Sequence, residues 1–221
     1  MRAKACKVRL LYLNPNSTEA MTQSMVAAAQ AAAPWAEISG WTNVDGPPAI
    51  QGAADGAAAV PGLQAMLPEA RAFGADALVI GCFDDTGLAE IRSAAHCPVI
   101  GIGQAAYHMA ALLGQRFSVV TTLPVSVPVI RGNIDSYGFA PNCVSVRASG
   151  LSVLEVEAGG SAVLARLGEE IVQAGTEGAQ SVVLGCAGMA PLRSALAANT
   201  PVPLVDGVAA AARLASAMVQ D

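Results

Sequence analysis

Ala77-Leu78-Val79-Ile80-Gly81-Cys82 and Ser181-Val182-Val183-Leu184-Gly185-Cys186 are two short apolar runs, and each ends in Gly-Cys. Both have the length and composition of a buried strand that passes into a turn before a helix. The two cysteines stand 104 residues apart, and the same offset aligns Ile100-Gly101-Ile102-Gly103 with Leu204-Val205-Asp206-Gly207. The sequence therefore predicts a half-domain that occurs twice, with one thiol at the same place in each half.

The rest of the chain alternates short strands with helices. Strands are expected at residues 8–13, 37–42, 78–81, 98–102, 117–122, 143–147, 182–185 and 203–205. Helices are expected at residues 18–33, 52–60, 63–74, 88–95, 103–113, 125–137, 162–174, 191–198 and 207–219. This alternation is typical of an α/β fold, in which each sheet is mostly parallel and flanked by helices.

The repeat divides this fold into two pseudo-symmetric, stacked lobes. We expect lobe 1 to comprise residues 1–102 and 207–221, with the C-terminal helix returning to it, and lobe 2 to comprise residues 103–206. Ligands of such folds bind beyond the carboxyl ends of the strands. Both Gly-Cys turns lie at strand ends, so the active site is predicted in the cleft between the lobes.

The composition limits the class of protein. Of the 221 residues, 53 % are apolar and only 13 % are charged, which is typical of a globular chain. The net charge is −5 and no lysine or arginine cluster occurs, so no nucleic-acid partner is expected. No apolar run has the length of a membrane span, and no signal peptide is predicted.

The cysteines indicate a reducing compartment. Their number, five, is odd, and their spacings form neither a C-x-x-C pair nor a zinc pattern. We therefore expect free thiols, a cytoplasmic location and no metal site. Cys6, Cys97 and Cys143 have no matching residue in the other half and are predicted to be structural.

Cys82 and Cys186 are the candidate catalytic residues. The pKa of a free thiol is about 8.5, and a helix N-terminus lowers it. Two thiols aimed at one cleft can act on opposite faces of a substrate, because one removes a proton as thiolate while the other returns a proton. The alternative is that each cysteine is a small buried apolar residue. Their equivalent positions favour the catalytic interpretation.

Both Gly-Cys turns also offer backbone groups to a ligand. Gly81 and Gly185 are expected to let the main chain approach a ligand closely. The N–H groups of the turn formed by Gly185, Cys186, Ala187 and Gly188 are suited to bind a carbonyl oxygen that gains negative charge. These groups are therefore candidate substrate-binding groups.

Two further strand ends carry polar candidates. Asn14 ends the first strand with a neutral donor and acceptor, although a turn residue before a proline explains it equally well. Thr121 and Thr122 end the matching strand of the second half, where β-propensity is the alternative. Because strand side chains alternate, one of these two threonines should point into the cleft.

Three polar features have local explanations. Asp84 and Asp85 are adjacent and rarely face the same way, so capping of the helix at residues 88–95 is preferred to a carboxylate pair. Asn16 and Glu19 predict a capping box for the helix at residues 18–33. His108 is expected to pack on its helix rather than to contact substrate or tune a thiol.

Several segments together resemble the Asp/Glu/hydantoin racemase superfamily, and within it the hydantoin and allantoin racemase branch. They cover nearly the whole chain: Leu13-Asn14-Pro15-Asn16-Ser17-Thr18, Gly81-Cys82-Phe83-Asp84-Asp85, Pro98-Val99-Ile100-Gly101-Ile102, Phe117-Ser118-Val119-Val120-Thr121-Thr122 and Val183-Leu184-Gly185-Cys186-Ala187-Gly188-Met189. The resemblance implies cofactor-independent epimerisation next to a carbonyl, with Cys82 and Cys186 as the catalytic pair. It further implies that Cys82 serves the D enantiomer and Cys186 the L enantiomer. The branch often carries proline where this chain has Thr86.

The residues after each thiol bear on the substrate. The amino-acid racemases of the superfamily usually show Cys-Asn-Thr and Cys-Thr there, and those side chains help to hold an α-carboxylate. Phe83 and Ala187 stand at these places here, which suits a flat, neutral cyclic ureide, although Phe83 is equally explained by core packing. We therefore expect a homo-oligomeric racemase of 5-substituted hydantoins or allantoin that needs no cofactor.

Three alternatives stay open. One is an amino-acid racemase, and another is a decarboxylase or cis-trans isomerase of the same superfamily, although such decarboxylases typically use a single cysteine. The third is a binding protein that has lost the chemistry, which unreactive thiols would indicate. The choice between hydantoin and allantoin is expected to depend on the loop at residues 46–51.

Overall fold

The computed structural model describes residues 7–113 and 116–219 and contains two four-stranded sheets. Sheet A has the strand order β2-β1-β3-β4 and is formed by β1 (Arg9–Asn14), β2 (Glu37–Thr42), β3 (Ala77–Ile80) and β4 (Val99–Gly101). Sheet B has the order β6-β5-β7-β8 and is formed by β5 (Phe117–Thr121), β6 (Cys143–Ala148), β7 (Ser181–Leu184) and β8 (Leu204–Asp206). The two orders match strand for strand, and all described pairings are parallel. The predicted pair of pseudo-symmetric α/β lobes is confirmed.

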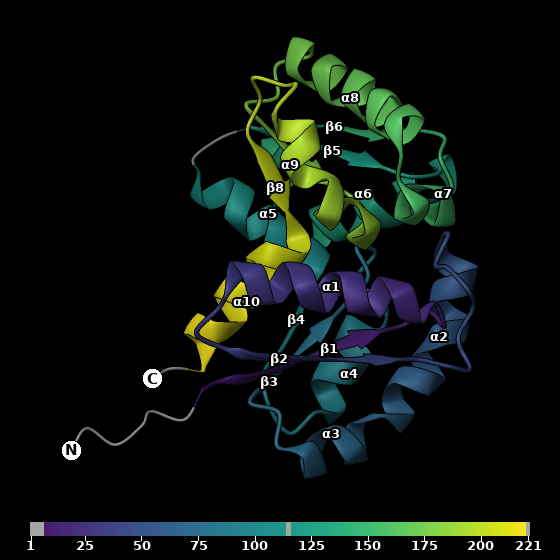
Figure 1. The fold of residues 1–221 in the computed structure, drawn as a ribbon, viewed down its shortest axis with the longest axis vertical. Coiled ribbons are helices and arrows are strands. Elements are labelled where there is room, and N and C mark those ends of the chain that lie inside the picture. Colours follow the sequence, from purple (N-terminus) through teal and green to yellow (C-terminus); the bar gives the residue numbers. More distant parts are fainter. Residues whose placement is uncertain (1–6, 114–115, 220–221) are drawn as a thin grey trace, which may run out of the picture.

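Helices cover both faces of each sheet, as Figure 1 shows. On the outer face of sheet A lie α2 (Ala53–Ala65), α3 (Leu67–Phe73) and α4 (Leu88–Ala94). On the outer face of sheet B lies α8 (Ser161–Thr176), with α9 (Arg193–Ala197) near β8. Between the sheets lie α1 (Glu19–Ala32), α5 (Ile102–Leu112), α6 (Val127–Ser136) and α10 (Gly207–Met218). The stacked layers place the strand ends of the two sheets near each other.

Because side chains alternate along a strand, β1 contributes residues to two hydrophobic cores. In β1, Leu10 and Tyr12 belong to the central core between the sheets, while Leu11 and Leu13 belong to the outer core under α2, α3 and α4. All four side chains are fully buried. Successive residues of a strand point to opposite faces, so a strand covered on both sides must be apolar throughout.

The helices α5 and α10 exchange sides. The helix α5 follows β4 of sheet A but packs against β7 and β8 of sheet B, whereas α10 follows β8 of sheet B but packs against β1, β3 and β4 of sheet A. The Tyr12 hydroxyl of β1 donates a hydrogen bond to the Val208 carbonyl of α10 at 2.8 Å. The helix α5 also contacts β4, and the division into residues 1–102 plus 207–221 and residues 103–206 stays a prediction.

Two segments differ from the sequence prediction. The segment before α8 forms a further helix, α7 (Val153–Ala158), which was not predicted. The helix predicted at residues 191–198 begins earlier as a 3-10 helix, Ala187–Leu192, and continues as α9. Pro191 lies inside this 3-10 segment, because proline has no N–H to donate to a regular α-helical ladder.

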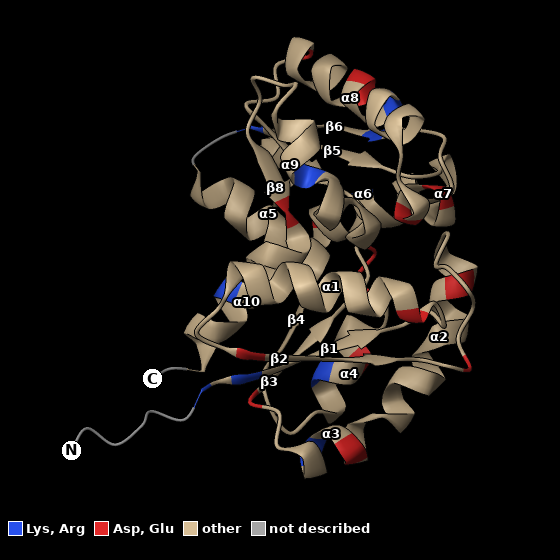
Figure 2. Cartoon of the chain, in the orientation of Figure 1, with Lys and Arg blue, Asp and Glu red and all other residues tan. Residues whose placement is uncertain are grey.

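Neither a membrane-spanning helix nor a cluster of basic residues is apparent in the part of the chain that the structure describes. Within residues 7–113 and 116–219, no helix combines the length and the apolar character that crossing a bilayer requires. In the view of Figure 2 the basic residues are distributed over separate elements of both lobes. This distribution agrees with the low content of charged residues.

Candidate active site

A cavity lies between the lobes at the carboxyl ends of β3, β5 and β7. It is narrow and partly open to solvent, with a cavity volume of about 30 Å³. Both lobes contribute to its wall, which is formed by Asn16, Met21, Ile50, Gly81, Cys82, Phe83, Asp84, Thr121, Thr122, Ser126, Val153, Gly185, Cys186 and Ala187.

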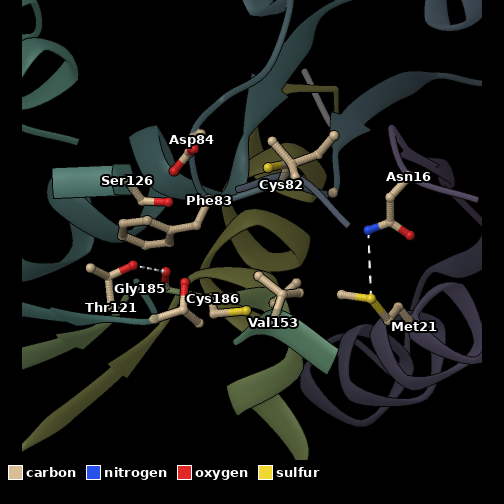
Figure 3. A pocket seen from close by; sticks show the side chains of 14 residues that line it. Asn16, Met21, Cys82, Phe83, Asp84, Thr121, Ser126, Val153, Gly185 and Cys186 are labelled. Atoms are coloured by element: carbon tan, nitrogen blue, oxygen red, sulfur yellow. Dashed lines mark hydrogen bonds between the residues drawn. The ribbon is translucent and has the colours of Figure 1, made fainter. Parts of the chain in front are cut away.

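The structure brings Cys82 and Cys186 together in this cavity. Cys82 follows β3, and Cys186 follows β7 and precedes the 3-10 helix Ala187–Leu192. Figure 3 shows their side chains entering the pocket from opposite sides. Inversion of a carbon centre requires two proton-transferring groups, one on each side of the bound ligand.

The pKa of each thiol is higher than the sequence led us to expect. Burial raises the pKa of Cys186 to about 12, and burial raises that of Cys82 further. The expected lowering by a helix N-terminus is wrong, because desolvation of the thiolate outweighs the nearby donors. The Asp84 N–H and the Thr86 hydroxyl lower the pKa of Cys82, and the Gly188 N–H lowers that of Cys186, but by less than burial raises them.

The glycines before the two thiols serve packing inside their own lobes. A Cβ on Gly81 would lie 2.8 Å from the Met25 Sδ and Cε atoms, and one on Gly185 would lie 2.8 Å from the Val120 carbonyl oxygen. The Gly185 N–H donates to that same carbonyl at 2.8 Å, so it is not available to a ligand. Both glycines also line the cavity, so the predicted close approach to a ligand stays a prediction beside this packing role.

The other predicted contacts divide into two groups. Phe83, Thr121, Thr122 and Ala187 line the cavity, so both threonines face it rather than one. The Phe83 ring also packs edge-on against Tyr107, with 5.6 Å between the ring centroids. Phe83 therefore both lines the cavity and packs in the core, the two roles considered for it from the sequence. The Thr121 hydroxyl donates to the Gly185 carbonyl at 3.0 Å and thereby joins the ends of β5 and β7.

Asn14 and Gly188 are not among the residues that line the cavity. The Asn14 amide nitrogen donates to Asn16 Oδ1 at 3.0 Å and to the Thr22 hydroxyl at 2.9 Å, and its Oδ1 accepts from the Asn16 N–H at 3.2 Å. Asn14 therefore holds Asn16, which does line the cavity, in place. The Gly188 N–H lowers the pKa of Cys186.

The predicted capping roles of two residues are wrong. The N-cap of α1 is Thr18, not Asn16, because Asn16 Oδ1 forms a tight turn by accepting from the Thr18 N–H at 2.9 Å. The N-cap of α4 is Gly87, and no side chain caps that helix. Asp85 instead accepts hydrogen bonds from the Gly103 N–H at 2.9 Å and the Gln104 N–H at 2.7 Å, in the first turn of α5.

Asp84 and Asp85 therefore have separate roles. Asp85 also accepts from the Tyr137 hydroxyl at 3.0 Å and ties the loop after Cys82 to lobe 2 helices. Asp84 lines the cavity, and within residues 7–113 and 116–219 it is the only Asp, Glu, Lys or Arg side chain that does so. Its Oδ2 is buried and has no hydrogen-bond partner among the described residues, and burial raises the pKa of Asp84 to about 7.

Sequence reasoning missed six residues of the cavity wall: Asn16, Met21, Ile50, Asp84, Ser126 and Val153. Ile50 lies in the loop at residues 46–51 that was expected to influence substrate choice. Val153 begins α7, whose capping box of Ser152 and Glu155 is a signal that the sequence contains. Met21 and Ser126 carry no comparable local signal.

The remaining titratable candidates lie elsewhere. His108 is exposed on α5, where its Nδ1 lies 2.8 Å from the Gln104 carbonyl and its ring packs edge-on against Phe139. Among the residues that the structure describes, no group of three His, Cys, Asp or Glu side chains could hold a metal ion. The chemistry available in the cavity is therefore that of two thiols, one carboxyl group, hydroxyls and backbone N–H groups.

Comparisons with known proteins place this geometry in context. The family model described as Asp/Glu/Hydantoin racemase matches residues 10–215. A hydantoin racemase from Rhizobium meliloti is 44 % identical over 209 residues, covering 94 % of this chain and 87 % of the relative.

Two solved structures are also similar. An allantoin racemase from Klebsiella pneumoniae superposes with a TM-score of 0.92 at 38 % identity, covering 96 % of this chain and 88 % of that one. An allantoin racemase from Pseudomonas fluorescens gives a TM-score of 0.87 at 32 % identity, covering 96 % of this chain and 91 % of that one. Glutamate racemase from Francisella tularensis, at 16 % identity and a TM-score of 0.68, shares the fold. With two such lobes around a pair of thiols and a family match over most of its length, the chain belongs to the Asp/Glu/hydantoin racemase family.

Proposed function

We propose that this protein is a cofactor-independent isomerase that racemises 5-substituted hydantoins or allantoin. The observation that carries the proposal is the placement of Cys82 and Cys186 at equivalent strand ends, on opposite sides of one cavity. The similarity to hydantoin and allantoin racemases supports the substrate class.

The reaction follows from the chemistry of the ring. The C5 proton lies between a carbonyl group and a ring nitrogen, so its removal leaves an enolate rather than an isolated carbanion. One cysteine, as thiolate, takes this proton and becomes a thiol. The other cysteine, as thiol, gives its proton to the opposite face of C5 and becomes a thiolate. The pair is then set for the opposite enantiomer, and no redox step or co-reactant is needed.

The enolate oxygen needs hydrogen-bond donors. The N–H groups of Cys186 and Ala187 take part in none of the hydrogen bonds of the described residues, and both residues line the cavity. Donors fixed at the point where charge develops stabilise the transition state more than the ground state. We assign the enolate oxygen to this pair, in place of the whole turn from Gly185 to Gly188.

The cavity favours a neutral substrate over an amino acid. Among the described residues, no lysine or arginine side chain lines the wall, so an α-carboxylate would enter without a cationic partner from them. A buried charge without a partner is costly. The faces of a neutral ring can instead pack against Phe83, Ile50 and Val153, which line the same cavity. An amino-acid racemase is therefore the weaker candidate.

The test uses enantiopure substrates in D2O. L- and D-forms of a 5-substituted hydantoin and of allantoin are incubated with the protein, and optical rotation and deuterium at C5 are followed together. Loss of rotation with deuterium uptake is the expected result for at least one of them. A higher kcat/KM for aspartate or glutamate would instead favour the amino-acid racemase.

A cysteine outside the cavity supplies the control. Cys97 lies next to β4 and does not line the cavity, so Cys97→Ser should leave racemisation unchanged. Unreactive Cys82 and Cys186 in an inactive wild-type protein would favour a binding protein. We keep the cytoplasmic location and the homo-oligomeric state as further proposals, with compartment fractionation and sedimentation as their measurements.

A further inference from the structure

Asp84 is a charged side chain in a cavity that is otherwise neutral. The other lining side chains are amide, hydroxyl, thiol, thioether or apolar groups. In Figure 3 the Asp84 carboxyl group lies at the pocket, on the side from which Cys82 enters. It is also close enough to both sulfur atoms for its charge to raise the pKa of Cys82 and of Cys186. The charge of the Asp84 carboxyl group thus acts on both cysteines of the cavity.

The backbone of Asp84 is held from two directions. Its N–H lowers the pKa of Cys82, and its carbonyl accepts a hydrogen bond from the Asn133 amide at 2.8 Å. These contacts fix the residue between the thiol turn and α6. The Asp84 side chain takes no part in joining the loop to α5 and Tyr137, because the adjacent Asp85 makes those contacts.

The Asp84 carboxyl group has an unmet hydrogen-bonding capacity. Its Oδ2 is buried and has no partner among the described residues. Leaving a buried acceptor unpaired costs free energy, and the cost is greater for a charged group. A ligand that carries an N–H group toward Oδ2 would offset this cost on binding, whereas a ligand that carries a carboxylate would add to it.

We propose that Asp84 determines substrate charge: its carboxylate accepts a hydrogen bond from an N–H group of the ligand and repels an anionic substituent at C5. This inference rests on the proposed function and refines it. The substrates it selects are neutral or cationic cyclic ureides with an N–H group next to the reacting carbon. It is a specificity role, separate from the proton transfers of the two thiols.

A matched pair of substrates tests the inference. Hydantoin-5-acetic acid carries a carboxylate on its C5 substituent, and its primary amide has nearly the same shape without the charge. The ratio of kcat/KM for the amide to that for the acid is measured for the wild-type protein and for Asp84→Asn, at about pH 8 so that Asp84 is ionised in the wild type.

The wild-type protein should favour the amide, and Asp84→Asn should reduce this preference about tenfold or more, because repulsion between two charges a few ångströms apart is strong in a partly buried site. Asp135→Asn removes the same charge from an exposed position on α6 and should leave the ratio unchanged. Asp84→Ser provides a second variant if Asp84→Asn does not fold.

The outcomes separate this inference from the proposed function. An active wild-type protein whose amide-to-acid ratio is the same in Asp84→Asn or Asp84→Ser would overturn the role of Asp84 and leave the racemase proposal intact. A wild-type protein that racemises no hydantoin and no allantoin would overturn both. A ratio that falls equally in Asp135→Asn would also overturn the inference, because the effect would then be one of net charge.

Discussion

The backbone N–H groups of Asp84 and Gly188 play the same part in the two lobes: each lowers the pKa of the cysteine two residues before it. The two residues are separated by the same 104 positions as the two cysteines. The repeat thus reproduces both the thiol and a donor that stabilises its thiolate. Without such donors, burial alone would raise the thiol pKa still further.

The first prediction concerns the thiols. Cys82→Ser and Cys186→Ser should each lower the racemisation rate by about 10²–10⁴-fold, since each removes one proton-transfer group. Each variant should keep C5 proton exchange with only one enantiomer, which deuterium uptake from D2O measures by NMR. A near wild-type rate in either variant would show that the two-thiol mechanism is wrong.

Thr86 distinguishes the two thiols. Its buried hydroxyl has no partner among the described residues and is placed to stabilise the Cys82 thiolate. Thr86→Val should therefore raise the Cys82 pKa and slow its alkylation by iodoacetamide about tenfold at a fixed pH, measured in a Cys186→Ser background. Thr86→Ser should restore the rate.

Thr176→Val, on the exposed face of α8, is the control for this experiment and should leave the alkylation rate unchanged. If Thr86→Val alkylates like the parent protein at every pH, the hydroxyl does not act on Cys82.

Asp84 should make stability depend on pH. Burial raises its pKa from 3.8 to about 7, so the folded state binds this proton more tightly than the unfolded chain does. Its contribution to stability is full below about pH 4 and is lost as the pH rises through about 7. Asp84→Asn stays neutral, so it should gain up to about 4 kcal/mol over the wild type between those limits.

Denaturant unfolding at several pH values measures this gain. Burial also raises the pKa of Asp85 to about 7 in both proteins, so most of its effect cancels in the difference; the Asp84 charge adds a smaller part of that rise, which Asp84→Asn removes. A difference in the free energy of unfolding that is constant with pH would contradict the prediction.

Gly185→Ala tests the close packing of β7 on β5. Its Cβ would lie 2.8 Å from the Val120 carbonyl oxygen and 2.8 Å from Val119 Cγ1, so the strands must shift, at a cost of about 1–3 kcal/mol. Gly168→Ala on α8 meets nothing within 4 Å and should stabilise the protein by about 0.5–1 kcal/mol, because it removes a helix-interior glycine. Thermal unfolding of the two variants should show opposite shifts in Tm.

The activity should need thiols and no metal. Dialysis against EDTA should leave racemisation intact, whereas alkylation of the protein should abolish it and substrate should protect against alkylation. Recovery of a chelated, inactive sample by a divalent cation would contradict the cofactor-independent mechanism.

The sequence was sufficient to predict the strands and the two thiols. Residues 77–80 are all apolar, and residues 181–184 are apolar except for Ser181, because each strand is covered on both faces; such runs are visible without a structure. The pairing of Cys82 with Cys186 followed from the repeat, because equivalent positions in two facing lobes meet at the same cleft.

The roles of polar loop residues could not be predicted from the sequence. Asp85 caps α5, whose first turn lies 18 and 19 residues further along the chain, rather than the helix directly after it. Asn16 is held by Asn14 and faces the cavity instead of capping α1. These contacts depend on how the loops fold back over the strand ends, and the local sequence pattern does not predict the path of a loop.

The exchange of α5 and α10 between the lobes has a consequence for synthesis on the ribosome. The strands of sheet A are complete once Gly101 has been added, but α10, which covers its inner face with Val208, Ala211, Ala212 and Ala215, is made only after all of sheet B. The strands made first therefore acquire their full cover last, and the nascent chain carries an open apolar face until residues 207–218 emerge from the exit tunnel.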